Sequence, residues 1–174
     1  TEHILNYNDQ GIALAGLIVE KLSHQSFYDV VEDNISNHLC MNNSSIRPEL
    51  PHPLKNNLAK SSAIDVNTIK SHAHDYILTY PAAGLVSSPS DIAKFIKMHL
   101  NSGSGLLSEN AIQEMHTRQF ANHPELRGWC YGFAEWYENG HRFIFKDGQA
   151  TGFNSRLFID PESKWGFYLV WNRS

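Results

Sequence analysis

The residues whose types and spacing could bind a metal lie at His72-Ala73-His74-Asp75. Two imidazoles and a carboxylate are common zinc ligands. Histidines at positions i and i+2 share a side only in a strand, however, and this stretch lies in a segment that we expect to be irregular. No second cluster of His or Cys completes a site by spacing. We therefore expect solvated loop histidines and no metal site.

Three other segments combine polar residues, glycines and helix starts in a specific order. The first is Tyr7-Asn8-Asp9-Gln10-Gly11, followed by a largely apolar stretch to Leu22. The second reads AGLVSSPSDIAKF over residues 83–95. The third reads KDGQATGFNS over residues 146–155 and continues through the Asp160-Pro161-Glu162 turn to Asn172. Together they resemble the C-terminal half to two-thirds of a serine hydrolase of the class C β-lactamase and penicillin-binding-protein type.

This resemblance implies an active site with three motifs: an S-x-x-K nucleophile, a Y-x-N loop and a K-x-G strand. Tyr7 matches the tyrosine, which implies that it moves protons beside the nucleophile, a role that requires positive charge near a phenol. Lys146 and Gly148 match the K-x-G strand, so the lysine would supply that charge and the glycine would let substrate approach the backbone. The resemblance also implies that the N–H of Gln149 is one of two oxyanion-hole donors. It implies no metal and no organic cofactor.

The chain departs from the family pattern in three places. No Ser or Thr is followed three residues later by Lys. Because S-x-x-K precedes Y-x-N in the family, we expect this chain to be a C-terminal fragment that is inactive alone. Asp9 stands where the family usually has asparagine, and an ionised carboxylate can only accept hydrogen bonds. Asp147 replaces a threonine that helps to bind a substrate carboxylate, and it would repel that carboxylate if it faced the site.

These departures predict a poor β-lactamase and set the range of functions. The parent protein would form an acyl-enzyme on an amide or ester. It could be an esterase, an amidase or peptidase that acts on a cationic substrate, or a pseudoenzyme. We place Tyr7 and Lys146 in catalysis and Asp9, Asp147, Gly148 and Gln149 in substrate binding. The alternative is a non-catalytic binding or regulatory module on the same scaffold.

Each of these residues also has a simpler interpretation. Tyr7 could be a packing tyrosine in front of a helix. Asp9 could be the N-cap of that helix, because aspartate and asparagine share this role. Lys146-Asp147-Gly148 could be an ordinary turn, since Asp-Gly is common in loops.

Composition limits the partners. The 174 residues carry 14 Lys and Arg against 18 Asp and Glu, a net charge of −4 without a basic stripe, which argues against nucleic-acid binding. The longest apolar run is far shorter than the ~20 residues of a membrane span. Cys40 and Cys130 are best interpreted as two ordinary thiols. We expect a small-molecule or peptide substrate in the intact parent, and either self-association or pairing with a missing N-terminal half. The resemblance alone suggests a periplasmic or extracellular location.

The hydrophobic pattern predicts an α+β fold with helices and a four-stranded antiparallel sheet. Residues 1–41 are expected to form a helical part whose first helix is largely buried, with a second helix beginning at Ser26. Residues 42–83 read as a long irregular excursion. In residues 84–128, Ser88 and Ser108 begin helices, and Asp91 is expected to complete a capping box with Ser88. Residues 129–174 read as two hairpins, the first turning at Asn139-Gly140 and returning over residues 141–145.

Overall fold

The computed structural model describes residues 4–65, 68–72, 77 and 79–173. In chain order its elements are α1 (Asp9–Ser23), α2 (Phe27–Val31), the π-helical turn η1 (Glu32–Ser36), α3 (His52–Asn56), β1 (Ser61–Asp65), β2 (Thr68–His72), α4 (Tyr80–Ala83), α5 (Pro89–Leu100), α6 (Glu109–His116), β3 (Phe120–Ala121), β4 (Gly128–Trp129), β5 (Ala134–Glu138), β6 (His141–Ala150), β7 (Phe153–Asp160) and β8 (Trp165–Trp171).

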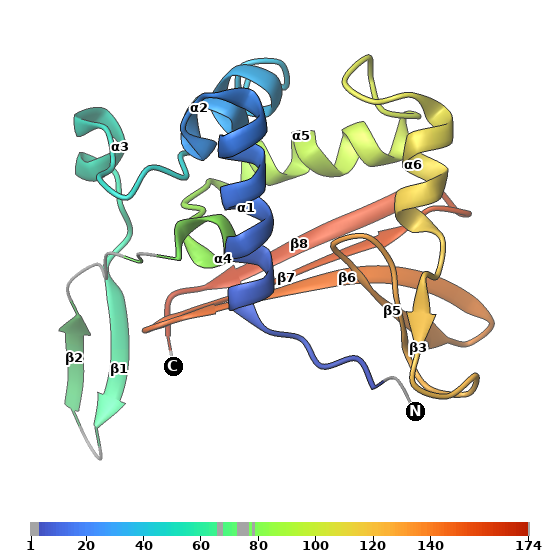
Figure 1. Ribbon diagram of the computed structural model, residues 1–174. Coiled ribbons are helices and arrows are strands. Elements are labelled where there is room, and N and C mark those ends of the chain that lie inside the picture. Colours follow the sequence, from blue (N-terminus) through green and yellow to red (C-terminus); the bar gives the residue numbers. More distant parts are fainter. Residues whose placement is uncertain (1–3, 66–67, 73–76, 78, 174) are drawn as a thin grey trace.

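The main sheet has six antiparallel strands in the order β3-β4-β5-β6-β7-β8. The α+β class is confirmed, but the prediction of four strands is wrong. The two additional strands, β3 and β4, have two residues each, which is too short to show an alternating pattern. Within the described chain the long helices α1, α5 and α6 lie on one side of this sheet (Figure 1).

The hydrophobic core lies between α5 and the inner face of the sheet. Ile92 and Ile96 of α5 belong to one buried cluster with Ile144, Leu157 and Ile159 of the strands. Ile144 and Ile159 are fully buried and are opposite each other in the β6–β7 register. This packing fixes which face of β6 points toward the helices.

Both predicted hairpins form. Asn139 and Gly140 have φ angles of 50° and 79°, which are the positive values that a two-residue type I′ turn requires at both central residues. The return strand β6 continues to Ala150, five residues beyond the predicted end. It continues because β7 pairs with residues 144–150 of β6, from Ile144↔Ile159 to Ala150↔Phe153.

The helix starts depend on local side chains. Ser26, Ser88 and Ser108 each accept a hydrogen bond from the backbone N–H three residues later, as predicted. At α1, however, the N-cap is Asn8, which accepts from the N–H of Gly11, and Asp9 is the first helical residue. The interpretation of Asp9 as N-cap is therefore wrong by one position.

Asp91 does not complete the capping box predicted for α5. Its carboxylate is fully buried and accepts hydrogen bonds from the Asn43 N–H (2.7 Å), the Ser44 hydroxyl (2.9 Å) and the Lys94 ammonium (2.8 Å). Burial alone would raise the pKa of Asp91, but hydrogen bonds from Lys94, Asn43 and Ser44 outweigh it and hold that pKa below its usual value. Asp91 thus ties the chain after η1 to α5.

Residues 42–83 are more regular than expected. They contain α3, α4 and the antiparallel β1–β2 hairpin, which lies to one side of the main sheet in Figure 1. Proline did not prevent these helices, because Pro53 and Pro81 lie in the first turns of α3 and α4, where a missing N–H costs nothing.

The first helix was expected to be largely buried and is not. Of its fifteen residues only Gly16 is buried. It lies at the contact with α4, so close that a Cβ at this position would be 2.6 Å from Pro81. Leu14, Leu17 and Ile18 are about half exposed, and Leu22 is 78 % exposed. These four leucine and isoleucine side chains therefore form an apolar surface of α1 that the described residues cover only in part.

Candidate functional site

Tyr7 and Lys146 meet although they are 139 residues apart. The Lys146 Nζ donates to the Tyr7 hydroxyl at 3.2 Å and lies 4.6 Å from the centre of the phenol ring. Tyr7 belongs to the extended segment before α1, and Lys146 comes from the second half of β6. The structure thus joins the two residues that the sequence singled out for catalysis.

The strand edge beside this pair is open. β5 pairs only with residues 141–145 of β6, while β7 pairs with residues 144–150. Lys146 to Ala150 therefore have a strand neighbour on the β7 side and, among the described residues, none on the β5 side. An unpaired strand edge presents backbone N–H and C=O groups to whatever lies against it. Gly148 and Gln149 belong to this edge.

The nearest neighbour of Gly148 across the strands is the Ser155 side chain. Gly148 is opposite Ser155 in the register of β6 and β7. A Cβ on Gly148 would lie 2.5 Å from the Ser155 Oγ, so a larger residue here would require the Ser155 hydroxyl to rotate away.

Asp147 points away from Lys146. Alternate residues of a strand face opposite sides of the sheet, and Lys146 is opposite the buried Leu157 whereas Asp147 is opposite Arg156. The Arg156 guanidinium donates two hydrogen bonds to the Asp147 carboxylate, at 2.5 Å and 2.7 Å. The Asp147 carboxylate is therefore neutralised on the outer face, and the structure does not bring it to the Tyr7–Lys146 pair.

Asp9 lies two residues after Tyr7, in the first turn of α1. Its side chain is exposed. Asn8, between them, uses its side-chain oxygen to cap the helix through the Gly11 N–H at 2.7 Å. The start of α1 therefore positions Tyr7 and Asp9 together at one end of the helix.

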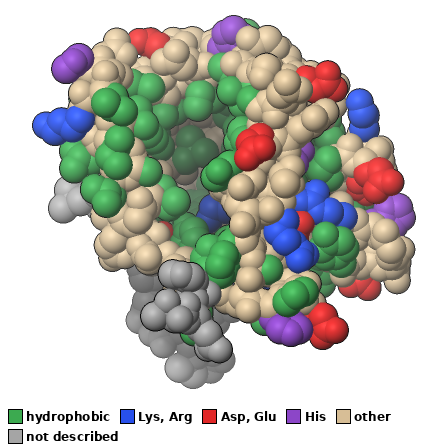
Figure 2. Space-filling view, turned by 45° about the vertical axis from the view of Figure 1, so that its right-hand side comes forward, with side chains coloured by type: hydrophobic (Ala, Val, Ile, Leu, Met, Phe, Trp, Pro, Cys, Tyr) green, Lys and Arg blue, Asp and Glu red, His purple; other side chains and the backbone are tan. Residues whose placement is uncertain are grey.

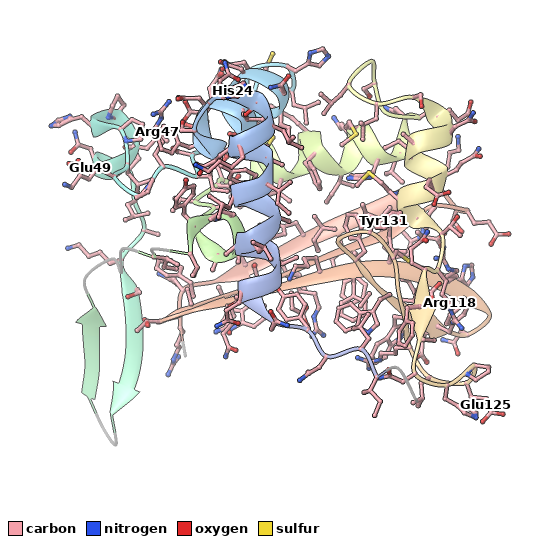
Figure 3. All side chains as sticks on the ribbon, in the orientation of Figure 1. His24, Arg47, Glu49, Arg118, Glu125 and Tyr131 are labelled. Atoms are coloured by element: carbon pink, nitrogen blue, oxygen red, sulfur yellow. The ribbon has the colours of Figure 1, made fainter. Side chains whose placement is uncertain are left out.

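One face of the molecule is hollowed. Figure 2 shows there a hollow whose walls are largely hydrophobic. Tyr131, which Figure 3 labels below α6, has a side chain that is 54 % exposed. A separate open cavity of about 560 Å³ is lined by Arg118, Arg127 and Trp136, among others, but not by Tyr7 or Lys146.

A buried ionic cluster supports the sheet next to α6. Glu135 is fully buried between two arginines, Arg118 and Arg142, with the Arg142 Nε at 2.6 Å. Burial would raise the pKa of Glu135, but hydrogen bonds and charge from Arg142 and Arg118 hold it below its usual value. We assign this cluster a structural role and not a catalytic one, because both arginines bind the Glu135 carboxylate and leave it enclosed.

The metal interpretation receives no support. His74 and Asp75 lie outside the described residues, as does the side chain of His72. In the part of the chain that the structure describes, no three His, Cys, Asp or Glu side chains are grouped so that they could hold a metal ion. Cys40 and Cys130 are both free thiols, as predicted.

Sequence reasoning missed two residues that touch the Tyr7 segment. The Tyr7 ring stacks on Trp129, with 5.9 Å between ring centres and an angle of 13° between planes. The Asn122 side chain is hydrogen-bonded to the backbone of Leu5. Neither residue belongs to a recognisable motif, and both contacts connect positions more than 110 residues apart.

The family model for beta-lactamases matches residues 3–174. The chain belongs to the beta-lactamase family. This confirms the resemblance predicted from the three segments. None of the described helices has the length and apolar character needed to cross a membrane.

Known members of this family and fold are considerably longer. Protein flp of Staphylococcus aureus is 22 % identical over 171 residues, which cover 95 % of this chain and 33 % of that protein. The octameric penicillin-binding protein homologue from Pyrococcus abyssi superposes with a TM-score of 0.87 at 23 % identity, covering 99 % of this chain and 40 % of its own. The D-amino acid amidase from Ochrobactrum anthropi has a TM-score of 0.81 at 19 % identity, and the match covers 99 % of this chain and 51 % of the amidase. These structures establish the shared fold, and the chain spans about a third to a half of each relative.

Proposed function

We propose that these residues form the tyrosine- and lysine-bearing part of a serine hydrolase that acts through an acyl-enzyme on an amide or ester. The observation that carries the proposal is the 3.2 Å contact between Lys146 Nζ and Tyr7 Oη beside an open strand edge. A phenol next to an ammonium group can hold or move a proton at its oxygen. This is the arrangement that activates a serine when the serine oxygen lies within hydrogen-bond reach.

The strand edge supplies the remaining groups. In this proposal substrate lies along Lys146 to Ala150, and the Gln149 N–H donates to the oxyanion that forms when the carbonyl is attacked. Gly148 leaves the backbone accessible at this edge. Asp9, at the start of α1, contributes a carboxylate to the substrate-binding surface.

In this proposal the S-x-x-K nucleophile comes from outside residues 1–174, since no Ser or Thr in this chain has Lys three positions later. We propose that the S-x-x-K serine and lysine belong to a further segment that lies in the hollow against the apolar surface of α1. The exposed side chains of Leu14, Leu17 and Ile18 support this proposal, since large apolar groups favour a covered position. Pairing with that segment, or with another copy of the chain, would cover them.

The two carboxylates near the candidate site bear on the substrate class. Because Asp147 is paired with Arg156 on the outer face, it gives no reason to exclude a substrate that carries a carboxylate. The Asp9 carboxylate can accept hydrogen bonds from an amine on the substrate, but unlike asparagine it has no N–H to donate to a substrate carbonyl. Asp9 therefore favours an amine-bearing substrate. A D-amino acid amidase from Ochrobactrum anthropi shares this fold, which supports an amide substrate in this proposal.

The second candidate is a binding or regulatory module that retains the scaffold without acyl transfer. The observation that favours it is Asp9, since the family usually has an asparagine there.

One experiment separates the two candidates. The complete gene product is treated with a fluorescent penicillin and, separately, with a serine-reactive fluorophosphonate, and any adduct is mapped by mass spectrometry. The hydrolase proposal predicts an adduct on a serine followed three residues later by lysine. It also predicts that Lys146→Ala and Tyr7→Phe slow labelling by about 10²-fold or more, whereas the control variants Lys55→Ala and Tyr137→Phe do not. Folded protein that both reagents fail to label would refute the hydrolase and support the binding module.

A further inference from the structure

Tyr7 lies in a segment that has no regular secondary structure. Residues 4–8 precede α1 and belong to neither sheet. The Tyr7 side chain is 42 % exposed, so burial does not fix its position. A hydroxyl that must stay within hydrogen-bond distance of Lys146 nevertheless needs a defined orientation, and this raises the question of what holds the ring.

The Asn122 side chain holds the backbone two residues before Tyr7. Its Oδ1 accepts from the Leu5 N–H at 2.8 Å, and its Nδ2 donates to the Leu5 carbonyl at 3.4 Å. A carboxamide that contacts both the N–H and the C=O of one residue reproduces the pairing that a neighbouring strand would give. Figure 3 shows Glu125, three residues further along the same loop, at the end of the molecule where the chain begins.

Trp129 holds the ring itself. The two rings are nearly parallel, with 13° between their planes and 5.9 Å between their centres, which is the range for offset stacking. Trp129 is held on both sides, because β4 pairs with β3 at Phe120↔Trp129 and with β5 at Trp129↔Ala134. The ring of Tyr7 therefore rests on a side chain whose backbone belongs to the sheet.

The two contacts and the lysine act on different parts of Tyr7. Asn122 fixes the backbone approach, Trp129 fixes the ring plane, and Lys146 contacts the hydroxyl at 3.2 Å. Lys146 and Trp129 come from β6 and β4 of the same sheet, so the distance between them is set by strand pairing.

We propose that Asn122 and Trp129 are positioning residues that hold the Tyr7 hydroxyl against Lys146. The consequence for catalysis rests on the proposed function, whereas the positioning itself does not. Loss of either contact lets the phenol leave its position, and a displacement of about 1 Å can cost ~10²-fold in rate. Because neither residue needs to touch substrate, the loss is expected in kcat with little change in KM.

The positioning is tested by NMR on the protein with 13C-labelled tyrosine. Stacking on an indole shifts the ring signals of Tyr7, which are assigned with Tyr7→Phe. We expect Trp129→Leu and Asn122→Ala to abolish this shift, Trp129→Phe to retain part of it, and the control Trp171→Leu to leave it unchanged. Trp129→Phe and Asn122→Ala keep the test decisive if Trp129→Leu does not fold. Tyr7 signals that are the same in the wild type and in all three test variants would overturn the proposal.

The catalytic consequence is measured separately, on the complete gene product with any substrate or acylating probe that it accepts. We expect Trp129→Leu and Asn122→Ala to lower kcat about tenfold or more, with KM within about twofold, and Trp129→Phe to recover part of the rate. If the NMR shift is lost while kcat is unchanged, the positioning stands and the catalytic role of Tyr7 in the proposed function is refuted. If kcat falls while the shift is unchanged, the positioning proposal fails.

Discussion

A pair of buried histidines should make the stability of this protein depend on pH. His99 of α5 and His116 of α6 are 3 % and 7 % exposed, and the His99 Nδ1 lies 3.0 Å from the His116 Nε2. Burial, with the neighbouring His116, lowers the pKa of His99 from 6.5 to about 4. Burial and the charge of Arg142 lower the pKa of His116 from 6.5 to about 4 as well. The folded state therefore keeps both rings neutral at pH values where the unfolded chain protonates them.

The size of the effect follows from these pKa values. Between pH 6.5 and about 4 the unfolded state binds more protons than the folded state. The stability that the neutral histidines contribute is therefore fully present above pH 6.5 and is lost as the pH is lowered to about 4. At about 1.4 kcal/mol per pH unit over about 2.5 pH units, the two rings together contribute about 7 kcal/mol. That is comparable with the whole stability of an ordinary domain, about 5–15 kcal/mol. The carboxyl groups of Asp91, Glu135 and Asp160, whose pKa values are lowered, act in a separate window below about pH 4.

The assay is urea unfolding followed by tryptophan fluorescence at half-unit steps from pH 7.5 to 4.5. We expect the free energy of unfolding to fall by up to about 2.7 kcal/mol per pH unit in the middle of the range, and His99→Phe to reduce that slope by about half. His24→Asn is the matched control, because His24 is exposed and has a left-handed φ of 57° that asparagine also tolerates. A stability that stays constant between pH 7 and 5, or equal slopes in the wild type and His99→Phe, would refute the reasoning.

Three further predictions concern buried and paired charges. Asp91→Ala should lower the free energy of unfolding by about 3 kcal/mol in urea titrations, because it leaves the Asn43 N–H and Ser44 hydroxyl without their buried acceptor. Glu135→Gln should cost a similar ~3 kcal/mol, since it removes the counter-charge between two arginines, and a loss below ~1 kcal/mol would mean that water replaces the carboxylate. Asp147→Asn should change the free energy of unfolding by less than ~1 kcal/mol, because the ion pair between Asp147 and Arg156 is exposed. The rate of probe labelling of the complete gene product should stay within about twofold of the wild type.

Sequence reasoning succeeded where structure depends on neighbouring residues in the chain. Ser26 and Ser88 begin helices by accepting an N–H three residues later, and Asn139-Gly140 forms the turn that its positive φ angles permit. The same reasoning failed where burial depends on distant partners. Leu22 belongs to an apolar stretch and is nevertheless 78 % exposed, while Asp91 lies at a helix start and is fully buried. The hydrophobic pattern indicates which side chains a helix could bury, but whether they are buried depends on the elements that pack against the helix.

The candidate site shows the same division. Tyr7 and Lys146 follow from the resemblance, but the face on which Asp147 lies depends on how far β6 extends. If the strand ended at Phe145, residues 146–148 could turn and direct both side chains toward one site. Because pairing with β7 extends β6 to Ala150, parity sends Lys146 inward and Asp147 outward. β5 has five residues and β6 has ten, so the mismatch in strand length also leaves the edge beside Lys146 open. The chemical character of this site is thus set by strand pairing as much as by the motif residues themselves.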